Sequence, residues 1–472
     1  MMQNVQSVIP FRAWRYNQRL AGPLSELVAP PYDVISPDLQ PRLYARSRYN
    51  VVRVDLGMTT PSDNDCDNPY TRSAAQLSEW KKAGILVHDD APSITFARET
   101  FAGPDGRLRN RHGFLALIKL HDFSERIVFP HEFTLSGPKE DRFRLMESTR
   151  MSLSPVFLLY NLPGDAITGA WNARISTSPS AFTVNDDAGT VTELWPTSDG
   201  AILDLVGQNL AAARFIIADG HHRYETALRY RDHRREREGA ECAACDKSPD
   251  RGSKSREKAY EYALAYFSNM ADPGLAIYGT HRLLSGLPAA QVAALPETLA
   301  GTFTVERLTS GSGLGADIVD TVDPEAPSRA IAAYLDGHPE GGAFGLAGPG
   351  LDAIYGVALA DRAALDAAVA GHSAAYRGLD VTILHSLVLE KLLGMTEADM
   401  AAEKYVTYVK DWNEAIRRLR SEAFQAAFFM NPTRLEQIRE VAMGGERMPQ
   451  KATFFYPKLP TGLVFHDLGG HV

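Results

Sequence analysis

Residues 215–228 read Phe215-Ile216-Ile217-Ala218-Asp219-Gly220-His221-His222-Arg223-Tyr224-Glu225-Thr226-Ala227-Leu228. The stretch opens with an apolar run in which two of the first three residues are β-branched, a pattern that predicts a short buried strand. Beyond Asp219-Gly220 the apolar residues recur at helical spacing as far as Tyr230. The stretch therefore predicts a strand that turns sharply at Asp219-Gly220 and opens a helix, as in an α/β fold.

The first turn of that helix carries chemistry as well as structure. It contains His221, His222 and Arg223. Free backbone N–H groups at a helix start attract anions, and a guanidinium matches phosphate or carboxylate oxygens in pairs. The alternative is a plain helix start that Asp219 caps, with a solvated histidine and arginine cluster. Four polar or ionisable residues in five positions favour an anion-binding corner.

Length, composition and net charge favour some classes of protein and exclude others. A chain of 472 residues with 44% hydrophobic and 23% charged residues is expected to form two or three globular domains, or one elaborated α/β domain. A net charge of −9 argues against a general nucleic-acid binder. The chain has no apolar run of membrane-spanning length, and residues 1–10 lack the apolar segment of a signal peptide. We expect a cytoplasmic protein.

Three cysteines fit a reducing compartment and no disulfide framework. Cys242 and Cys245 form a Cys-x-x-Cys pair in the hydrophilic stretch 234–258. A structural zinc site would need two more ligands, and the chain has no second such pair. Two surface thiols are the favoured interpretation.

Periodicity and composition predict further elements along the chain. They are a strand at 51–56, a helix at 71–83, two strands joined by the turn 103–106, a helix at 139–149, a strand at 155–160 and a helix or buried segment at 259–270. Residues 285–370 are rich in alanine and glycine. The predicted organisation is a core at 1–284, a peripheral α/β subdomain at 285–370 and a segment at 371–472 that closes onto the core.

Phosphoryl transfer needs a cradle for the donor phosphates, positive charge at the transferring group and a base at the acceptor. The corner supplies the cradle, and Asp219 is a candidate magnesium ligand or acceptor-positioning group. Thr226, one turn into the helix, offers a hydroxyl to the phosphates. The alternative is a hydroxyl that bonds back within its own helix.

A second group of ionisable residues precedes the predicted helix at 139–149. His131-Glu132 is followed within ten residues by Lys139 and Arg142, so acid/base and anion-binding groups are concentrated there. Glu132 is a candidate base for a hydroxyl if burial raises its pKa. The alternative is a salt-bridged loop and helix start.

Further landmarks occur at both ends of the chain. They read Phe11-Arg12-Ala13-Trp14-Arg15-Tyr16, Val28-Ala29-Pro30-Pro31-Tyr32-Asp33-Val34-Ile35-Ser36, His131-Glu132-Phe133-Thr134, Gly137-Pro138-Lys139, Asp141-Arg142, Ser154-Pro155-Val156-Phe157 and Met448-Pro449-Gln450-Lys451-Ala452-Thr453-Phe454-Phe455-Tyr456-Pro457-Lys458-Leu459. With the corner at Asp219, the chain resembles the domain-of-unknown-function family 1015. More distantly, the turn Asp219-Gly220-His221-His222-Arg223 resembles the phosphate-binding box of the ParB and sulfiredoxin-like superfamily, which includes free-serine kinases.

The resemblance implies a mixed α/β fold with a ParB/sulfiredoxin-like core and an inserted peripheral subdomain. It implies phosphoryl transfer to a small hydroxyl metabolite, most concretely free serine, with ATP or ADP and Mg²⁺. Predicted phosphate-binding residues are Gly220, His222, Arg223, Thr226, Lys139, Arg142 and Lys451, and predicted catalytic residues are Asp33, His131, Glu132, Asp219 and His221. Asp33 competes with Glu132 as the base, because two prolines fix it and the related kinases use an N-terminal carboxylate. A turn aspartate that caps the next backbone is the alternative.

Two other functions stay open. The same site with a water in place of the acceptor would be a phosphatase or phosphoester hydrolase. A non-catalytic switch or metabolite sensor would bind the nucleotide without turnover. The net negative charge of the chain argues against a version that binds DNA. The expected partners are a nucleotide and a small molecule, with a homodimer left open and no membrane.

Overall fold

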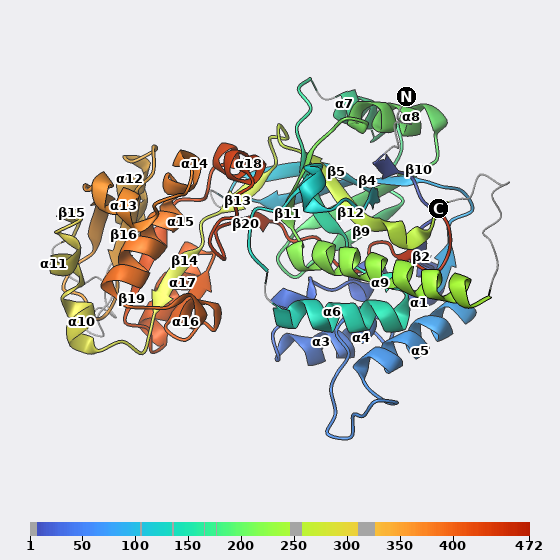
Figure 1. The fold of residues 1–472 in the computed structure, drawn as a ribbon, viewed down its shortest axis with the longest axis horizontal. Helices are drawn as coiled ribbons and strands as arrows, with labels where there is room; N and C mark the ends of the chain where they lie inside the picture. The colour runs from blue at the N-terminus through green and yellow to red at the C-terminus, as the bar shows by residue number, and fades with distance from the viewer. Residues whose placement is uncertain are drawn as a thin grey trace. The chain divides into compact units, whose positions relative to one another are not determined.

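The structure is a computed structural model that describes residues 7–103, 106–134, 136–164, 166–175, 177–245, 257–309 and 326–472, with the backbone alone at residues 136 and 240–245. The chain divides into two compact units (Figure 1). Unit 1 comprises Met1–Pro130, Thr134–Leu275 and Pro457–Val472, and unit 2 comprises His131–Phe133 and Ala276–Tyr456.

Unit 1 is built on a nine-stranded mixed sheet. Its path runs β6-β11-β8-β12-β5-β4-β10-β9, with β1 paired to β5. The pairs β11·β6 and β12·β8 are parallel and the others are antiparallel. The strands are β1 (Val8–Ile9), β4 (Ile94–Ala102), β5 (Leu108–Lys119), β6 (Val128–Phe129), β8 (Val156–Tyr160), β9 (Phe182–Asn185), β10 (Val191–Thr197), β11 (Phe215–Asp219) and β12 (Tyr262–Asn269).

Helices lie on both sides of this sheet (Figure 1). On one side α6 and α9 pack side by side, and α5 packs on α6; α7 and α8 pack together on the other side. The helices of unit 1 are α1 (Gln18–Ala21), α2 (Leu24–Leu27), α3 (Leu39–Arg46), α4 (Val52–Asp55), α5 (Pro69–Lys82), α6 (Ser136–Thr149), α7 (Ala166–Ile175), α8 (Gly200–Leu210) and α9 (His221–Cys245), with the 3-10 turns η1 (Tyr32–Val34), η2 (Phe123–Glu125) and η3 (Ala259–Glu261). Short ribbons pair β2 (Trp14–Tyr16) with β3 (Leu86–His88) and β7 (Met151–Ser152) with β21 (His466–Asp467).

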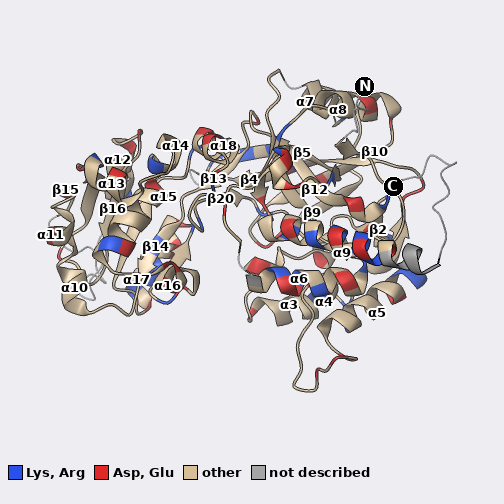
Figure 2. Cartoon of the chain, in the orientation of Figure 1, with Lys and Arg blue, Asp and Glu red and all other residues tan. Residues whose placement is uncertain are grey.

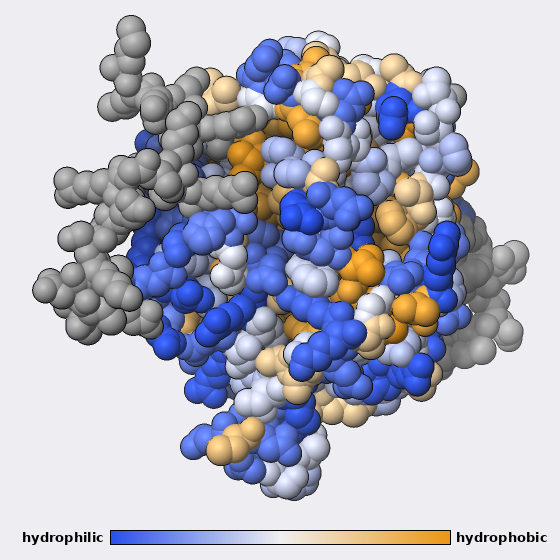
Figure 3. Space-filling model, turned by 90° about the vertical axis from the view of Figure 1, so that its right-hand side faces the viewer, coloured by the Kyte–Doolittle hydropathy of each residue, from blue (hydrophilic) through white to orange (hydrophobic). Residues whose placement is uncertain are grey.

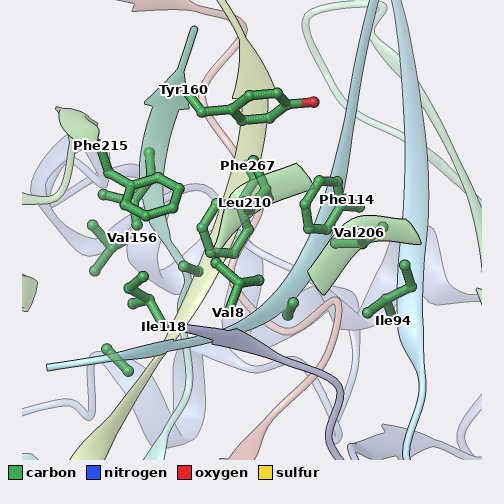
Figure 4. Packing of buried hydrophobic residues seen from close by; sticks show 14 of the residues in the cluster. Val8, Ile94, Phe114, Ile118, Val156, Tyr160, Val206, Leu210, Phe215 and Phe267 are labelled. Carbon is green, nitrogen blue, oxygen red and sulfur yellow. The ribbon is translucent and has the colours of Figure 1, made fainter. Parts of the chain in front are cut away.

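The main core of unit 1 lies against the sheet. Val206 and Leu210 of α8 point toward Phe114 of β5 and Phe267 of β12 (Figure 4). The Phe114 and Phe267 rings stack with their centroids 5.0 Å apart. Burial of this apolar surface fixes the strands, and with them the end of β11.

Unit 2 has a six-stranded antiparallel sheet in the order β15-β17-β16-β19-β14-β18. Its strands are β14 (His281–Leu284), β15 (Phe303–Arg307), β16 (Ala343–Ala347), β17 (Tyr355–Leu359), β18 (Val406–Val409) and β19 (Ala426–Met430), beside the ribbon of β13 (Ala276–Tyr278) and β20 (Phe454–Tyr456). Its helices are α10 (Ala289–Ala293), α11 (Leu295–Leu299), α12 (Ala326–Asp336), α13 (Arg362–Ala368), α14 (Ala374–Arg377), α15 (Asp380–Ile383), the π-helix η4 (Leu384–Leu392), α16 (Glu397–Ala401), α17 (Trp412–Ser421) and α18 (Leu435–Gly444).

The mixed α/β class is confirmed, as are several elements. The helix at 71–83 is α5, the two strands about 103–106 are the antiparallel pair β4·β5, and β11 leads into α9. The strand predicted at 51–56 is wrong. Residues 52–55 form helix α4, because Val51, Val52 and Val54 are all buried and tertiary packing overrides the β-branched pattern. Of the two alternatives for 259–270, the buried segment is confirmed and the helix is wrong. Residues 262–269 form β12, whose eight residues are buried in the middle of the sheet, so the run lacks alternation.

The observed division differs from the predicted boundaries. The main part of unit 2 runs from Ala276 to Tyr456, since β18 and β19 pair with β14 in its sheet. Of the predicted closing segment 371–472, Pro457–Val472 belongs to unit 1.

Lysine, arginine, aspartate and glutamate residues are mixed along the helices of unit 1 (Figure 2). Acidic and basic residues alternate along α6 and α9 (Figure 2), and one pair of them is Arg229 with Glu140 at 2.7 Å. The face drawn in Figure 3 is mainly hydrophilic, with small separate hydrophobic groups. Across the described residues, no helix combines the length and apolar character that crossing a membrane requires.

Candidate functional site

The turn between β11 and α9 depends on a glycine. β11 ends at Asp219, Gly220 has a φ of +87°, and α9 begins at His221. The Gly220 carbonyl accepts a hydrogen bond from the Tyr224 N–H at 3.0 Å, which closes the first turn. A Cβ at Gly220 would lie 2.8 Å from Arg223 Nε. Glycine therefore permits both the positive φ and the folding of Arg223 back over the turn.

Arg223 links this turn to a neighbouring loop. Its Nη1 donates to Ser154 Oγ at 2.7 Å and to the Pro155 carbonyl, and its Nη2 donates to Asp219 Oδ2 at 2.5 Å. Lys458 Nζ donates to the other Asp219 oxygen, Oδ1. Three segments that are far apart in sequence, at 154–155, 219–223 and 458, thus meet at one point, which we call the Asp219 corner.

The Asp219 corner is largely shielded from water. The side chains of Arg223, Asp219 and Lys458 are 10%, 16% and 17% exposed. Burial alone would raise the pKa of Asp219, but the positive charges of Lys458 and Arg223 hold that pKa well below its usual range. His221, which is buried, also lowers it. Two cations therefore converge beside the first turn of a 25-residue helix, where the helix dipole adds further positive potential.

A small pocket adjoins the Asp219 corner within unit 1. Its polar lining comes from Tyr32, Asp55, Arg142, Ser152, Ser154, Arg223 and Thr226, and its apolar lining includes Leu145, Met146, Met151, Val156, Ala227 and Leu264. Its volume of about 40 Å³ has room for a few water molecules or one small polar group.

Arg142 holds one wall of this pocket. Its Nη1 donates to the Asp55 carbonyl at 2.8 Å and to Asp55 Oδ1 at 3.1 Å, and its Nη2 lies 2.6 Å from Asp141 Oδ2. Its guanidinium also lies over the Tyr32 ring, 4.2 Å from the centroid. Arg142 is thus a buried structural cation that orders α4, α6 and η1 around the pocket.

The predicted site residues are divided between the two units. Unit 1 contains Asp33, Lys139, Arg142, Asp219, Gly220, His221, His222, Arg223 and Thr226, and unit 2 contains His131, Glu132 and Lys451. Within unit 1 the structure places Arg142, Arg223 and Thr226 around the pocket. Asp33 is exposed on η1, and Lys139 pairs with Glu225 at 2.9 Å.

In unit 2 the predicted site residues form hydrogen bonds between segments that are far apart in the sequence. His131 Nε2 lies 2.9 Å from Thr453 Oγ1. Glu132 Oε1 accepts from the Thr453 N–H at 3.1 Å and from Thr453 Oγ1 at 3.2 Å. The Lys451 carbonyl accepts from Arg282 Nη2 at 3.1 Å. These contacts give His131 and Glu132 a structural role in joining 131–132 to 453.

The described side chains do not fit a metal held by the protein alone. They include no cluster of three or more histidine, cysteine, aspartate or glutamate residues that could bind an ion. Both Asp219 oxygens already accept from cations, so this arrangement does not favour Asp219 as a magnesium ligand. The Cys242 and Cys245 side chains lie outside the described residues, and Cys66 is an exposed free thiol.

Sequence reasoning missed three residues of this site. Ser154 and Lys458 stand in the quoted landmarks but carry no periodic signal, and Asp55 was hidden by the mistaken strand at 51–56. Thr226 also differs from the alternative considered for it, because its buried Oγ1 has no hydrogen-bond partner and does not bond back within α9.

The sequence matches the family described as "Protein of unknown function (DUF1015)" over residues 8–382. The chain belongs to this family. No curated protein matches it. Among solved structures it is similar to a mutant free serine kinase in complex with AMP, at 14% identity over 75% of this chain and 92% of that chain, with a TM-score of 0.36.

Two further structures are similar to the chain. A conserved hypothetical protein from Pyrococcus furiosus has 14% identity over 74% of this chain and 95% of that chain, with a TM-score of 0.33. C-terminally truncated SbnI from Staphylococcus aureus has 10% identity over 76% and 87%, with a TM-score of 0.32. Because these scores are below 0.5, we base no conclusion about the site on them. The ParB/sulfiredoxin-like box stays a prediction.

Proposed function

We propose that this protein transfers a phosphoryl group from a nucleotide to a small hydroxyl metabolite, with the nucleotide phosphates bound at the Asp219 corner. The observation that carries the proposal is the convergence of Arg223 and Lys458 beside the first turn of α9. Partly buried cations at a helix N-terminus are suited to bind phosphate and to neutralise charge as it develops on a transferring phosphoryl group.

The roles within this proposal follow from position. The first turn of α9, with Gly220, His221 and His222, faces the phosphates, and Arg223 and Lys458 neutralise the transferring group. Asp219 holds both cations in place. Since this residue set does not fit a protein-held magnesium ion, no step is assigned to one. Free serine as the acceptor, and ATP or ADP as the donor, rest on the resemblance of the motifs to free-serine kinases.

The test is calorimetric titration of the full chain with ATP and with ADP. Lys458→Met keeps the length of the side chain and removes its charge. Arg229→Met is the control for loss of a cation, because Arg229 lies on α9 away from its first turn, is 50% exposed and pairs with Glu140 on the surface. We expect nucleotide affinity to fall at least about tenfold in K458M, as for the loss of one charge-assisted hydrogen bond, and to stay within twofold in R229M.

Phosphorus NMR after addition of serine then separates the functions. A phosphoserine resonance together with conversion of ATP to ADP, or of ADP to AMP, supports the kinase. Nucleotide binding without turnover would contradict the proposal and favour a switch or sensor. Absence of nucleotide binding, with hydrolysis of a phosphoester instead, would favour the phosphatase.

A further inference from the structure

Asp55 is a buried carboxylate with one oxygen that no protein group satisfies. The residue is 5% exposed at the end of α4, and its Oδ1 accepts from Arg142. Its Oδ2 is buried and has no hydrogen-bond partner. Buried polar atoms in folded proteins are nearly always paired, so an orphan of this kind marks a place for a bound group.

The orphan oxygen belongs to a residue of the pocket beside the Asp219 corner. Arg223 and Thr226 line the same pocket, and the buried Thr226 Oγ1 has no partner either. Arg223 is therefore shared by the corner and the pocket. A hydroxyl group is small enough for the pocket, and there it could donate to Asp55 while its oxygen faces the cationic side.

The groups around Asp55 keep it ready to accept a proton. Burial raises its pKa, and the positive charges of Arg142 on α6 and Arg223 on α9 oppose that rise. Asp141 on α6 and Asp33 on η1 raise it further, and the net result is a raised pKa. A general base works best when its pKa approaches the working pH, so this environment suits the role.

We propose that Asp55 is the base that takes the proton of the acceptor hydroxyl, with the hydroxyl bound in the pocket between Asp55 Oδ2 and Arg223. This rests on the proposed function. The hydroxyl proton moves to Asp55 Oδ2, and the hydroxyl oxygen forms a bond to the terminal phosphorus of the nucleotide. The bond from that phosphorus to its bridging oxygen breaks, and its electron pair stays on the departing nucleotide.

The other carboxylates are less suited. Asp219 is held ionised by two cations, which makes it a weak proton acceptor. Glu132 belongs to unit 2, where its Oε1 accepts two bonds from Thr453. Asp33 is exposed to water. Asp55 combines burial, an unsatisfied oxygen and a place in the pocket.

The test compares wild type with Asp55→Asn, which keeps the size of the side chain and an oxygen for Arg142 but cannot take the proton. Glu140→Gln is the matched control, an amide in place of a carboxylate on α6 that is 46% exposed. We expect ATP affinity within twofold of wild type in both variants. Phosphoserine formation is expected to fall about 100-fold or more in D55N and to be unchanged in E140Q.

The pH profile guards against a purely structural effect of the substitution. In wild type the acid limb of kcat/KM should have an apparent pKa above the ordinary aspartate value of about 4, and D55N should lack that limb. If the acid limb of the wild-type kcat/KM profile has an apparent pKa at or below 4, the assignment is overturned, even if D55N misfolds. Full activity in D55N overturns it while the proposed function stands. A wild type that binds nucleotide and transfers no phosphate refutes both.

Discussion

Replacing Asp219 by Asn should destabilise unit 1 strongly at neutral pH. The substitution removes the carboxylate that accepts from Arg223 at 2.5 Å and from Lys458, while both cations stay largely shielded from water. Removing one partner of a buried ion pair costs about 3–5 kcal/mol, because an uncompensated charge stays behind. Since the three side chains are 10–17% exposed, water screens them little. Asparagine keeps one hydrogen-bond acceptor, so we expect a loss near 3 kcal/mol.

The loss should depend on pH in a defined direction. The native-state pKa of Asp219 lies well below its unfolded value of about 3.9, so the folded protein binds fewer protons there than the unfolded chain. A depressed carboxyl pKa contributes stability that is complete above the unfolded pKa and disappears as the pH falls toward the folded one. The difference between wild type and D219N should therefore be constant from pH 7 to 5 and should shrink below about pH 4.

Urea unfolding followed by tryptophan fluorescence measures this difference. Trp14, Trp80, Trp171 and Trp195 lie in unit 1 and Trp412 in unit 2, so the signal comes mainly from the unit that contains Asp219. Asp187→Asn is the control, because Asp187 pairs with Arg46 but is 63% exposed, and it should cost at most about 1 kcal/mol. A loss below 1 kcal/mol in D219N at pH 7, or a difference that does not narrow below pH 4, would refute the charge argument.

Three other substitutions test the same unit by urea unfolding. Gly220→Ala should cost about 2 kcal/mol and weaken ATP binding, because a Cβ at a φ of +87° meets Arg223 at 2.8 Å; an unchanged midpoint would show that the turn relaxes. Thr226→Val should be neutral or stabilise by up to about 1 kcal/mol, since it removes a buried hydroxyl without a partner; loss of ATP binding would instead make that hydroxyl a ligand. Arg111→Met should cost about 3–5 kcal/mol, because it leaves the fully buried Glu99 without the guanidinium 2.7 Å away; a loss below 1 kcal/mol would contradict this.

The sequence pattern predicted an element correctly where the spacing of its apolar residues matches the side of the element that is buried. The strand, turn and helix about Gly220 follow from apolar spacing and one glycine, and the structure has β11 and α9 there. The prediction failed where tertiary burial dominates. Val51, Val52 and Val54 pack into the interior at the cap and within helix α4, although their residue types favour a strand.

Only those contacts of the site that join residues close together in the sequence could be predicted. Arg223 and Asp219 are neighbours on one turn, so their ion pair could be anticipated from spacing. Lys458 reaches the same carboxylate from 239 residues away. Ser154 meets Arg223 across 69 residues. Such contacts are set by the order of strands in the sheet, which one sequence does not reveal.

The contrast between Asp219 and Asp55 assigns roles that residue type alone does not. Both carboxylates interact with Arg223, and desolvation raises the pKa of each. At Asp219 a second cation, Lys458, reverses the effect, whereas at Asp55 the neighbouring Asp141 and Asp33 oppose the arginines. When the environments of two carboxyl groups in one site shift their pKa values in opposite directions, one can stay a fixed charge while the other accepts a proton. On this reasoning Asp219 organises the cations and Asp55 accepts the proton, so D219N should impair nucleotide binding, and D55N should impair turnover while nucleotide binding is kept.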